Sequence, residues 1–130
     1  MQLSNLLRTI LKLDAASCLG MAAVLVPGGA MLEPLLGVPA ALLTGAGLSL
    51  VPIGLFILWL GMRGEAPATL VYLVILGNVG WSLASFGAAA FIPMISALGV
   101  AAVSAQAIAV AAFAMLEYAA VRAAPSTATR

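Results

Sequence analysis

The most prominent pattern in the chain is a series of long apolar runs separated by short breaks. The breaks contain proline, glycine or charge, as in Pro27-Gly28-Gly29, Arg63-Gly64-Glu65 and Pro93. Each run is close to the ~20 residues that an α-helix needs to cross ~30 Å of hydrocarbon. The pattern predicts an all-α, four-helix transmembrane bundle, with spans at about 6–26, 39–62, 68–92 and 94–121. We expect residues 1–124 to form one membrane domain and residues 125–130 to form a flexible tail.

A short apolar segment, residues 30–36, lies between the first two predicted spans and is interrupted by Glu33 and Pro34. It is too short to cross a bilayer, so we expect a short helix or turn in the interface, with Glu33 directed to water. The alternative is that the first helix continues past a kink at Pro27.

The composition supports a membrane location, because 65% of the residues are hydrophobic and only 7% are charged. Soluble domains carry about 25% charged residues, so a soluble globular protein is excluded. A net charge of +1 gives no basic footprint for nucleic acid. The chain has no histidine and one cysteine, which excludes a zinc site built from these residues, a c-type haem and an intrachain disulfide. We therefore expect no metal and no cofactor.

The basic residues all fall on one side of a four-span arrangement. They are Arg8, Lys12, Arg63, Arg122 and Arg130. Loops rich in lysine and arginine stay in the cytoplasm, so this distribution predicts that both termini are cytoplasmic.

Small residues recur at four-residue spacing in three of the predicted spans. Such stripes let helices approach closely in lipid, and here they predict a tight bundle with little interior void. They comprise Ala41, Gly45 and Ser49, then Gly80, Ala84 and Ala88, and finally Ala97, Ala101, Ala105 and Ala109.

Two carboxylates, Asp14 and Glu117, fall within predicted spans, where ionisable groups are costly and are functional candidates by default. Both are expected about a turn below the cytoplasmic face. In one interpretation they are solvated there or paired with Arg8, Lys12 or Arg63. In the other they belong to polar faces that turn away from lipid.

Helical spacing places polar residues on one face of each of three spans. The first span contributes Asp14 and Ser17, the third contributes Asn78, Trp81, Ser82 and Ser85, and the fourth contributes Gln106, Phe113 and Glu117. These nine residues are the candidate polar interior. Asn78 and Gln106 would either hydrogen-bond across helices and fix their register, or line a small cytoplasm-facing pocket with Trp81 and Phe113 as walls.

Three short segments carry a resemblance to a known group of proteins. They are Leu13-Asp14-Ala15-Ala16-Ser17, Leu35-Leu36-Gly37-Val38-Pro39 and Gly77-Asn78-Val79-Gly80-Trp81. With these segments the chain resembles small four-span inner-membrane proteins of bacteria, a group without an assigned activity. The resemblance implies a multi-pass fold in the bacterial inner membrane, and it transfers no catalytic residue or substrate.

The sequence favours a non-enzymatic role. We expect a protein that binds a hydrophobic or amphipathic small molecule or lipid, or that docks as an accessory subunit of a membrane complex. The expected partners are membrane lipid and either further copies of the chain or a larger membrane complex. The alternative is a small oligomeric transporter or channel in which Asp14 and Glu117 handle protons or a cationic solute. An enzyme is not expected, because nucleophile, base and orienting group cannot be assembled from these residues.

Overall fold

The computed structural model describes residues 1–123 and contains four α-helices. They are α1 (Asn5–Leu36), α2 (Ala40–Gly61), α3 (Ala68–Phe91) and α4 (Ala97–Ala123). Each is long and apolar enough to cross a membrane, which confirms the predicted all-α fold and makes the chain a multi-pass membrane protein. The predicted tail at 125–130 lies outside the described residues.

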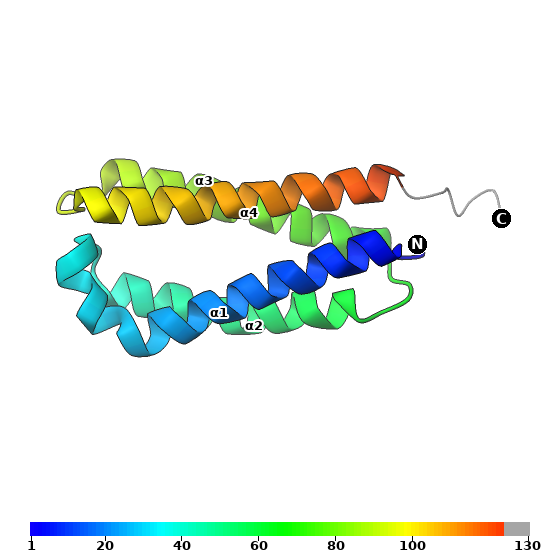
Figure 1. Cartoon of the computed structure of the whole chain (residues 1–130), viewed down its shortest axis with the longest axis horizontal. Coiled ribbons are helices and arrows are strands. Elements are labelled where there is room, and N and C mark those ends of the chain that lie inside the picture. Colours follow the sequence, from blue (N-terminus) through cyan, green and yellow to red (C-terminus); the bar gives the residue numbers. More distant parts are fainter. Residues whose placement is uncertain (124–130) are drawn as a thin grey trace.

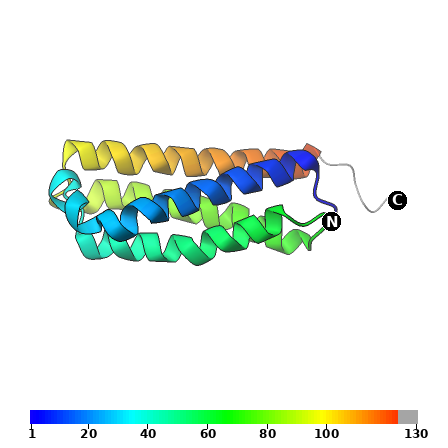
Figure 2. The ribbon, with the colours of Figure 1, turned by 60° about the horizontal axis from the view of Figure 1, so that its bottom comes forward.

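The helices form two antiparallel hairpins that lie side by side. In Figure 1, α3 and α4 form one layer and α1 and α2 the other, and Figure 2 shows the four helices running alongside one another. The closest packing is within the hairpins, α1 against α2 and α3 against α4. Between the hairpins α1 packs against α4, whereas α2 and α3 hardly touch. The bundle therefore has one loose seam, between α2 and α3.

The expected separate segment at 30–36 is wrong, because α1 continues through Pro27 to Leu36. A proline removes one backbone hydrogen bond and bends a helix, and the last turns of α1 curve away from its axis (Figure 1). Contacts with α2 support this extension. Gly29 lies against Thr44, where an added Cβ would come within 2.6 Å of the hydroxyl oxygen. The bend thus lets the end of α1 follow the start of α2.

Glu33 has a more specific role than the expected contact with water. Its side chain is exposed, but Oε1 accepts a hydrogen bond from the backbone N–H of Ala40 at 2.8 Å. This carboxylate satisfies a free donor at the start of α2 and complements the positive end of the helix dipole. Gly37, at φ 69°, ends α1 in the left-handed conformation that favours glycine.

Hydrogen bonds fasten both ends of the bundle. At one end Ser96 donates its backbone N–H to the Leu36 carbonyl at 2.9 Å and its hydroxyl to the Leu35 carbonyl at 2.7 Å. At the other end the first residues pair with the α2–α3 loop, where Leu3 N–H donates to the Gly64 carbonyl at 2.9 Å. The turns of the two hairpins are thus joined at one end, and the start of the chain is joined to the α2–α3 loop at the other.

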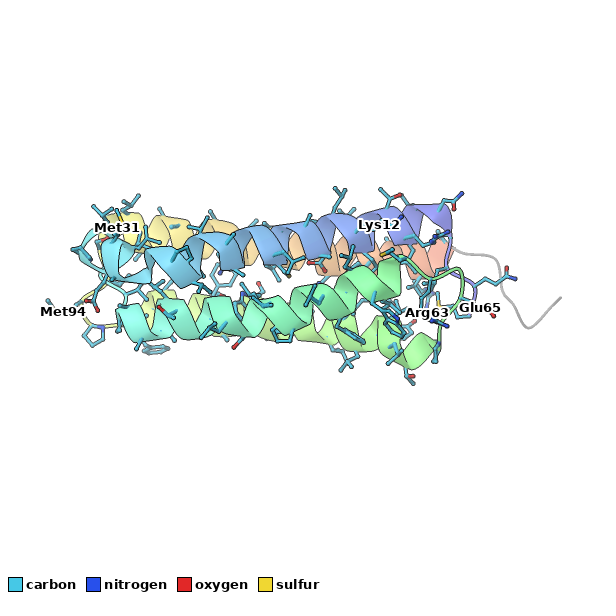
Figure 3. The ribbon with its side chains drawn as sticks, turned by 90° about the horizontal axis from the view of Figure 1, so that it is seen from below. Lys12, Met31, Arg63, Glu65 and Met94 are labelled. Atoms are coloured by element: carbon cyan, nitrogen blue, oxygen red, sulfur yellow. The ribbon has the colours of Figure 1, made fainter. Side chains whose placement is uncertain are left out.

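The basic residues of the described chain gather at the end that holds the N-terminus. Figure 3 shows Lys12 and Arg63 toward this end, and Met31 and Met94 at the opposite one. Arg8 donates from Nε to the Gly61 carbonyl at 3.3 Å and from Nη2 to the Met62 carbonyl at 3.4 Å. It thereby caps the negative end of the α2 dipole. Arg122 lies in the last turn of α4, and Arg130 lies outside the described residues.

Close packing of α1 on α2 depends on glycines that the four-residue stripes did not include. Gly47, Gly54 and Gly61 recur at every seventh position of α2 and face α1. A Cβ at Gly47 would lie 2.9 Å from the Leu25 Cβ. Gly45 and Gly80, which the stripes assigned to packing, have no heavy atom within 4 Å of an added Cβ. The stripe prediction is wrong for these two positions, because spacing identifies a shared face but not the face that meets a neighbour.

We predict that Gly47→Ala destabilises the bundle and that Gly45→Ala does not. The new methyl group at position 47 collides with α1, and overpacking of this kind costs about 1–3 kcal/mol in unfolding free energy. The same methyl group at position 45 meets open space. Thermal unfolding of both variants in the same detergent measures the difference. Equal stability of the two variants would contradict the packing described here.

Candidate functional site

A carboxylate–amide cluster, Asp14, Asn78 and Glu117, joins three helices inside the bundle. Asn78 Nδ2 donates to Asp14 Oδ2 at 2.7 Å and to Glu117 Oε1 at 2.9 Å. Asp14 and Glu117 are fully buried, and Asn78 is 6% exposed. At ~1.5 Å of rise per residue, the three residues lie roughly 9–15 Å from the nearer ends of their helices. The cluster therefore lies about two to three helical turns from the basic end of the bundle.

The cluster contains no positively charged side chain from the described residues. Among residues 1–123 neither carboxylate has a cationic partner, so the expected pairing with Arg8, Lys12 or Arg63 is wrong. Glu117 Oε2 is buried without any hydrogen-bond partner. Cys18 adds only a weak donor, with its Sγ 3.8 Å from Asp14 Oδ1. Both carboxylates thus depend on the single amide of Asn78.

A second group of hydrogen bonds ties α3 to α4 further along the helices. Trp81 Nε1 donates to Gln106 Oε1 at 3.1 Å. The buried Ser82 hydroxyl donates to the Ala107 carbonyl at 2.8 Å. Ser85 instead donates to the Trp81 carbonyl in its own helix, at 2.7 Å. Asn78, Ser82 and Gln106 all bond across helices, which is how polar groups stabilise packing in lipid.

A cavity of about 520 Å³ lies beside the cluster, and we call it the Asn78 cavity. All four helices contribute to its wall, which is almost entirely apolar. Its lining includes Cys18, Ile53, Phe56, Leu73, Trp81 and Phe113 together with Asn78. Ile53 of α2 is 40% exposed and Leu73 of α3 is 58% exposed. These exposed lining residues indicate that the cavity reaches the surface along the loose seam between α2 and α3.

A second cavity, of about 580 Å³, continues along the same seam toward the opposite end of the bundle. Its wall includes Val38, and we call it the Val38 cavity. Met21, Trp81 and Gln106 line both cavities, so the Trp81–Gln106 hydrogen bond lies at the boundary between them. The expected bundle with little interior void is therefore wrong, because α2 and α3 do not close on each other.

The structure places the nine predicted site residues in three settings. Asp14, Asn78, Ser82 and Glu117 are buried, and Trp81, Ser85, Gln106 and Phe113 are partly buried. Ser17 is exposed and borders the Asn78 cavity. Asp14 and Glu117 line neither cavity, and Ser85 lines only the Val38 cavity. Asn78 is the member that belongs to both the cluster and a cavity, and a part in binding for these residues stays a prediction.

None of the nine predicted site residues lies on α2, although α2 supplies one side of the Asn78 cavity. Pro52, Ile53 and Phe56 line it, and none of them is polar. The available signal was the proline, which marks a bend, with an aromatic side chain four residues later on the same face. Polar periodicity could not find this wall, because the wall has no polar side chain.

Residues 1–123 contain no group of three histidine, cysteine, aspartate or glutamate side chains arranged to hold a metal ion. Comparison of the chain with protein-family models, with curated proteins and with solved structures finds no match.

We predict that Asn78→Leu lowers the unfolding free energy by about 1–3 kcal/mol, because it leaves two buried carboxylates without their shared donor. Ser82→Ala is the matched control, since it removes one buried interhelical hydrogen bond, worth about 0.6 kcal/mol on average in membranes. Thermal unfolding in detergent measures both variants.

Replacing Asp14, Asn78 and Glu117 together with leucine should recover most of the stability lost in Asn78→Leu. Removing all partners of a buried polar group is far less costly than removing one of them. If Asn78→Leu is no less stable than Ser82→Ala, the cluster does not hold the bundle together.

Proposed function

We propose that this chain is a membrane protein that binds an amphipathic molecule, a lipid or another small molecule with an apolar body, and that it does so without catalysing a reaction. The observation that carries the proposal is the Asn78 cavity, an apolar space along the α2–α3 seam with the amide of Asn78 in its wall. Its volume of about 520 Å³ falls in the range of small-molecule sites, which also combine apolar walls with a few placed polar groups.

The membrane setting determines where selectivity for such a ligand comes from. Lipid tails are as apolar as leucine, so an apolar body gains little by leaving the bilayer for the cavity. A polar group of the ligand gains more, because it exchanges hydrocarbon for the fixed amide of Asn78. The apolar walls therefore set the shape of the ligand, and the polar end of the cavity sets its chemistry.

Transport of protons or cations by Asp14 and Glu117 is less well supported than binding. Both side chains are fully buried, and neither lines a cavity. A transported ion needs a path to the carboxylates, whereas an amphiphile can reach the Asn78 cavity through the α2–α3 seam.

We also propose a location in the bacterial inner membrane, with the basic end of the bundle in the cytoplasm. Arg8, Lys12, Arg63 and Arg122 lie toward the same end of the bundle, and positively charged loops are retained on the cytoplasmic side.

Ligand binding is tested with the fluorescence of Trp81. The chain has two tryptophans, so Trp59→Phe leaves Trp81 as the reporter in the cavity wall. In phosphatidylcholine nanodiscs, an octadecyl alcohol with a brominated chain should quench Trp81 saturably. Gly77 lines the cavity and an added Cβ there meets open space, so Gly77→Leu places its side chain in the cavity and should weaken binding at least about fivefold.

Gly80→Leu is the control for this experiment. Gly80 lies on the same helix and also faces open space, but it lines neither cavity. Its affinity should equal that of the Trp59→Phe parent. Quenching that never saturates, or that Gly77→Leu and Gly80→Leu change equally, would refute binding in the cavity.

Orientation is tested with single cysteines in a Cys18→Ala background. Gly64 lies at the basic end, and Met94, 81% exposed, lies at the opposite end. A membrane-impermeant maleimide should label Met94→Cys in spheroplasts, and it should label Gly64→Cys only in inside-out vesicles. The reverse pattern would overturn the proposed orientation.

A further inference from the structure

The amide of Asn78 has a fixed orientation, and this determines what it offers to the Asn78 cavity. Both N–H groups of Nδ2 are used, one by each carboxylate. The opposite orientation would direct the amide oxygen at two carboxylates and lose both hydrogen bonds. Asn78 Oδ1 therefore points away from the carboxylates, and no residue from 1 to 123 donates a hydrogen bond to it. Asn78 is only 6% exposed and lines the Asn78 cavity. Its oxygen, which has no donor among these residues, therefore faces that cavity.

The other polar groups in the wall do not satisfy this acceptor. Gln106 Oε1 accepts from Trp81, and Gln106 Nε2 donates to the Val103 carbonyl at 2.9 Å. Cys18 directs its thiol toward Asp14. Ser17 is exposed and borders the cavity. The Asn78 oxygen is thus an acceptor that no residue from 1 to 123 satisfies, so the ligand group that meets it has to be a hydrogen-bond donor.

The carboxylates behind Asn78 make that acceptor stronger. An amide that donates to charged acceptors is polarised, which places more negative charge on its oxygen. Asp14 and Glu117 are both fully buried and bind the same amide, and two carboxyl groups this close in a medium of low dielectric constant share one proton. The pair therefore brings one negative charge close to the cavity.

The basic side chains of the described chain make no polar contact with the cluster. Arg8 donates to the end of α2, Arg63 lies 4.9 Å from the Trp59 ring centre, and Arg122 lies 6.0 Å from that of Tyr118. Lys12 is exposed. None of them has an ion pair with the cluster. The polar end of the cavity therefore attracts positive charge as well as a donor.

We infer that the ligand is a cationic amphiphile, whose protonated amine donates to Asn78 Oδ1 while its apolar chain occupies the Asn78 cavity along the α2–α3 seam. The inference rests on the proposed binding function and adds the chemistry of the head group. A hydroxyl group would satisfy the acceptor but would leave the negative charge of Asp14 and Glu117 without compensation, whereas an ammonium group does both.

The test compares three quenchers that share one brominated octadecyl chain and differ in head group: an amine, an alcohol and a carboxylate. Each is titrated into the Trp59→Phe protein in phosphatidylcholine nanodiscs, and the saturable quenching of Trp81 gives its affinity. The amine should bind at least about tenfold more tightly than the alcohol, and the carboxylate should bind most weakly. This comparison uses one protein, so it does not depend on the folding of a variant.

The double substitution Asp14→Asn with Glu117→Gln tests the source of the preference. It removes both acidic groups, and with them the charge of the pair, at nearly unchanged volume, and the ratio of amine to alcohol affinity should fall to about one. Glu65→Gln is the charge-matched control, because Glu65 is an exposed acid in the α2–α3 loop, and it should keep the ratio of the parent.

Each outcome separates the two proposals. Equal affinity for amine and alcohol, or tighter binding of the carboxylate, would overturn the cationic head group while leaving amphiphile binding in place. An amine preference that survives the double substitution would also overturn the inference, because its cause would not be the carboxylates. If no quencher binds saturably, amphiphile binding itself fails, and the head-group inference fails with it.

Discussion

The hydrogen bonds from the Asn78 amide to Asp14 and Glu117 are the constraint on which the arrangement of the helices depends. In lipid, helices gain little from hydrophobic association, so directional polar contacts decide how they are rotated and how deep they sit. Asn78 of α3 meets α1 and α4 at once. Contacts within each hairpin need only a short turn, but this contact joins one hairpin to the other. It therefore also determines which sides of α2 and α3 are left apart.

Most of the fold could be predicted from the sequence, because the bilayer requires runs of fixed length and apolar character. The ends of α2, α3 and α4 fall within a few residues of the predicted spans. The path after Pro27 could not be predicted in this way. A proline breaks an isolated helix, but the turns that follow it lie against α2, and Glu33 caps that helix. Such support comes from tertiary structure and leaves no local signal.

The candidate site was predictable on the side where it is polar. Helical spacing placed Asp14, Asn78 and Glu117 on inward faces, and all three are buried. Spacing could not show that one amide serves both carboxylates, because it does not specify the relative heights of different helices. It gave a pocket walled by Trp81 and Phe113 as one of two alternatives, and both residues line the Asn78 cavity. It could not decide between the alternatives, because the space left between helices depends on which small residues touch a neighbour. An added Cβ would collide with α1 at Gly47 and would meet open space at Gly45, although the two glycines lie two positions apart on one helix.

The bundle is tied at its two ends and loose between them. Ser96 holds the end of α1 at one membrane face, and the paired loop at Gly64 holds the other. These ties restrain both ends, so a ligand of the proposed kind would enter through the seam from the side rather than through either end. A ligand would have to enter laterally from the hydrocarbon core. Its effective concentration would therefore depend on how strongly it partitions into the bilayer. The protein would therefore bind molecules dissolved in the membrane and not molecules dissolved in the cytoplasm.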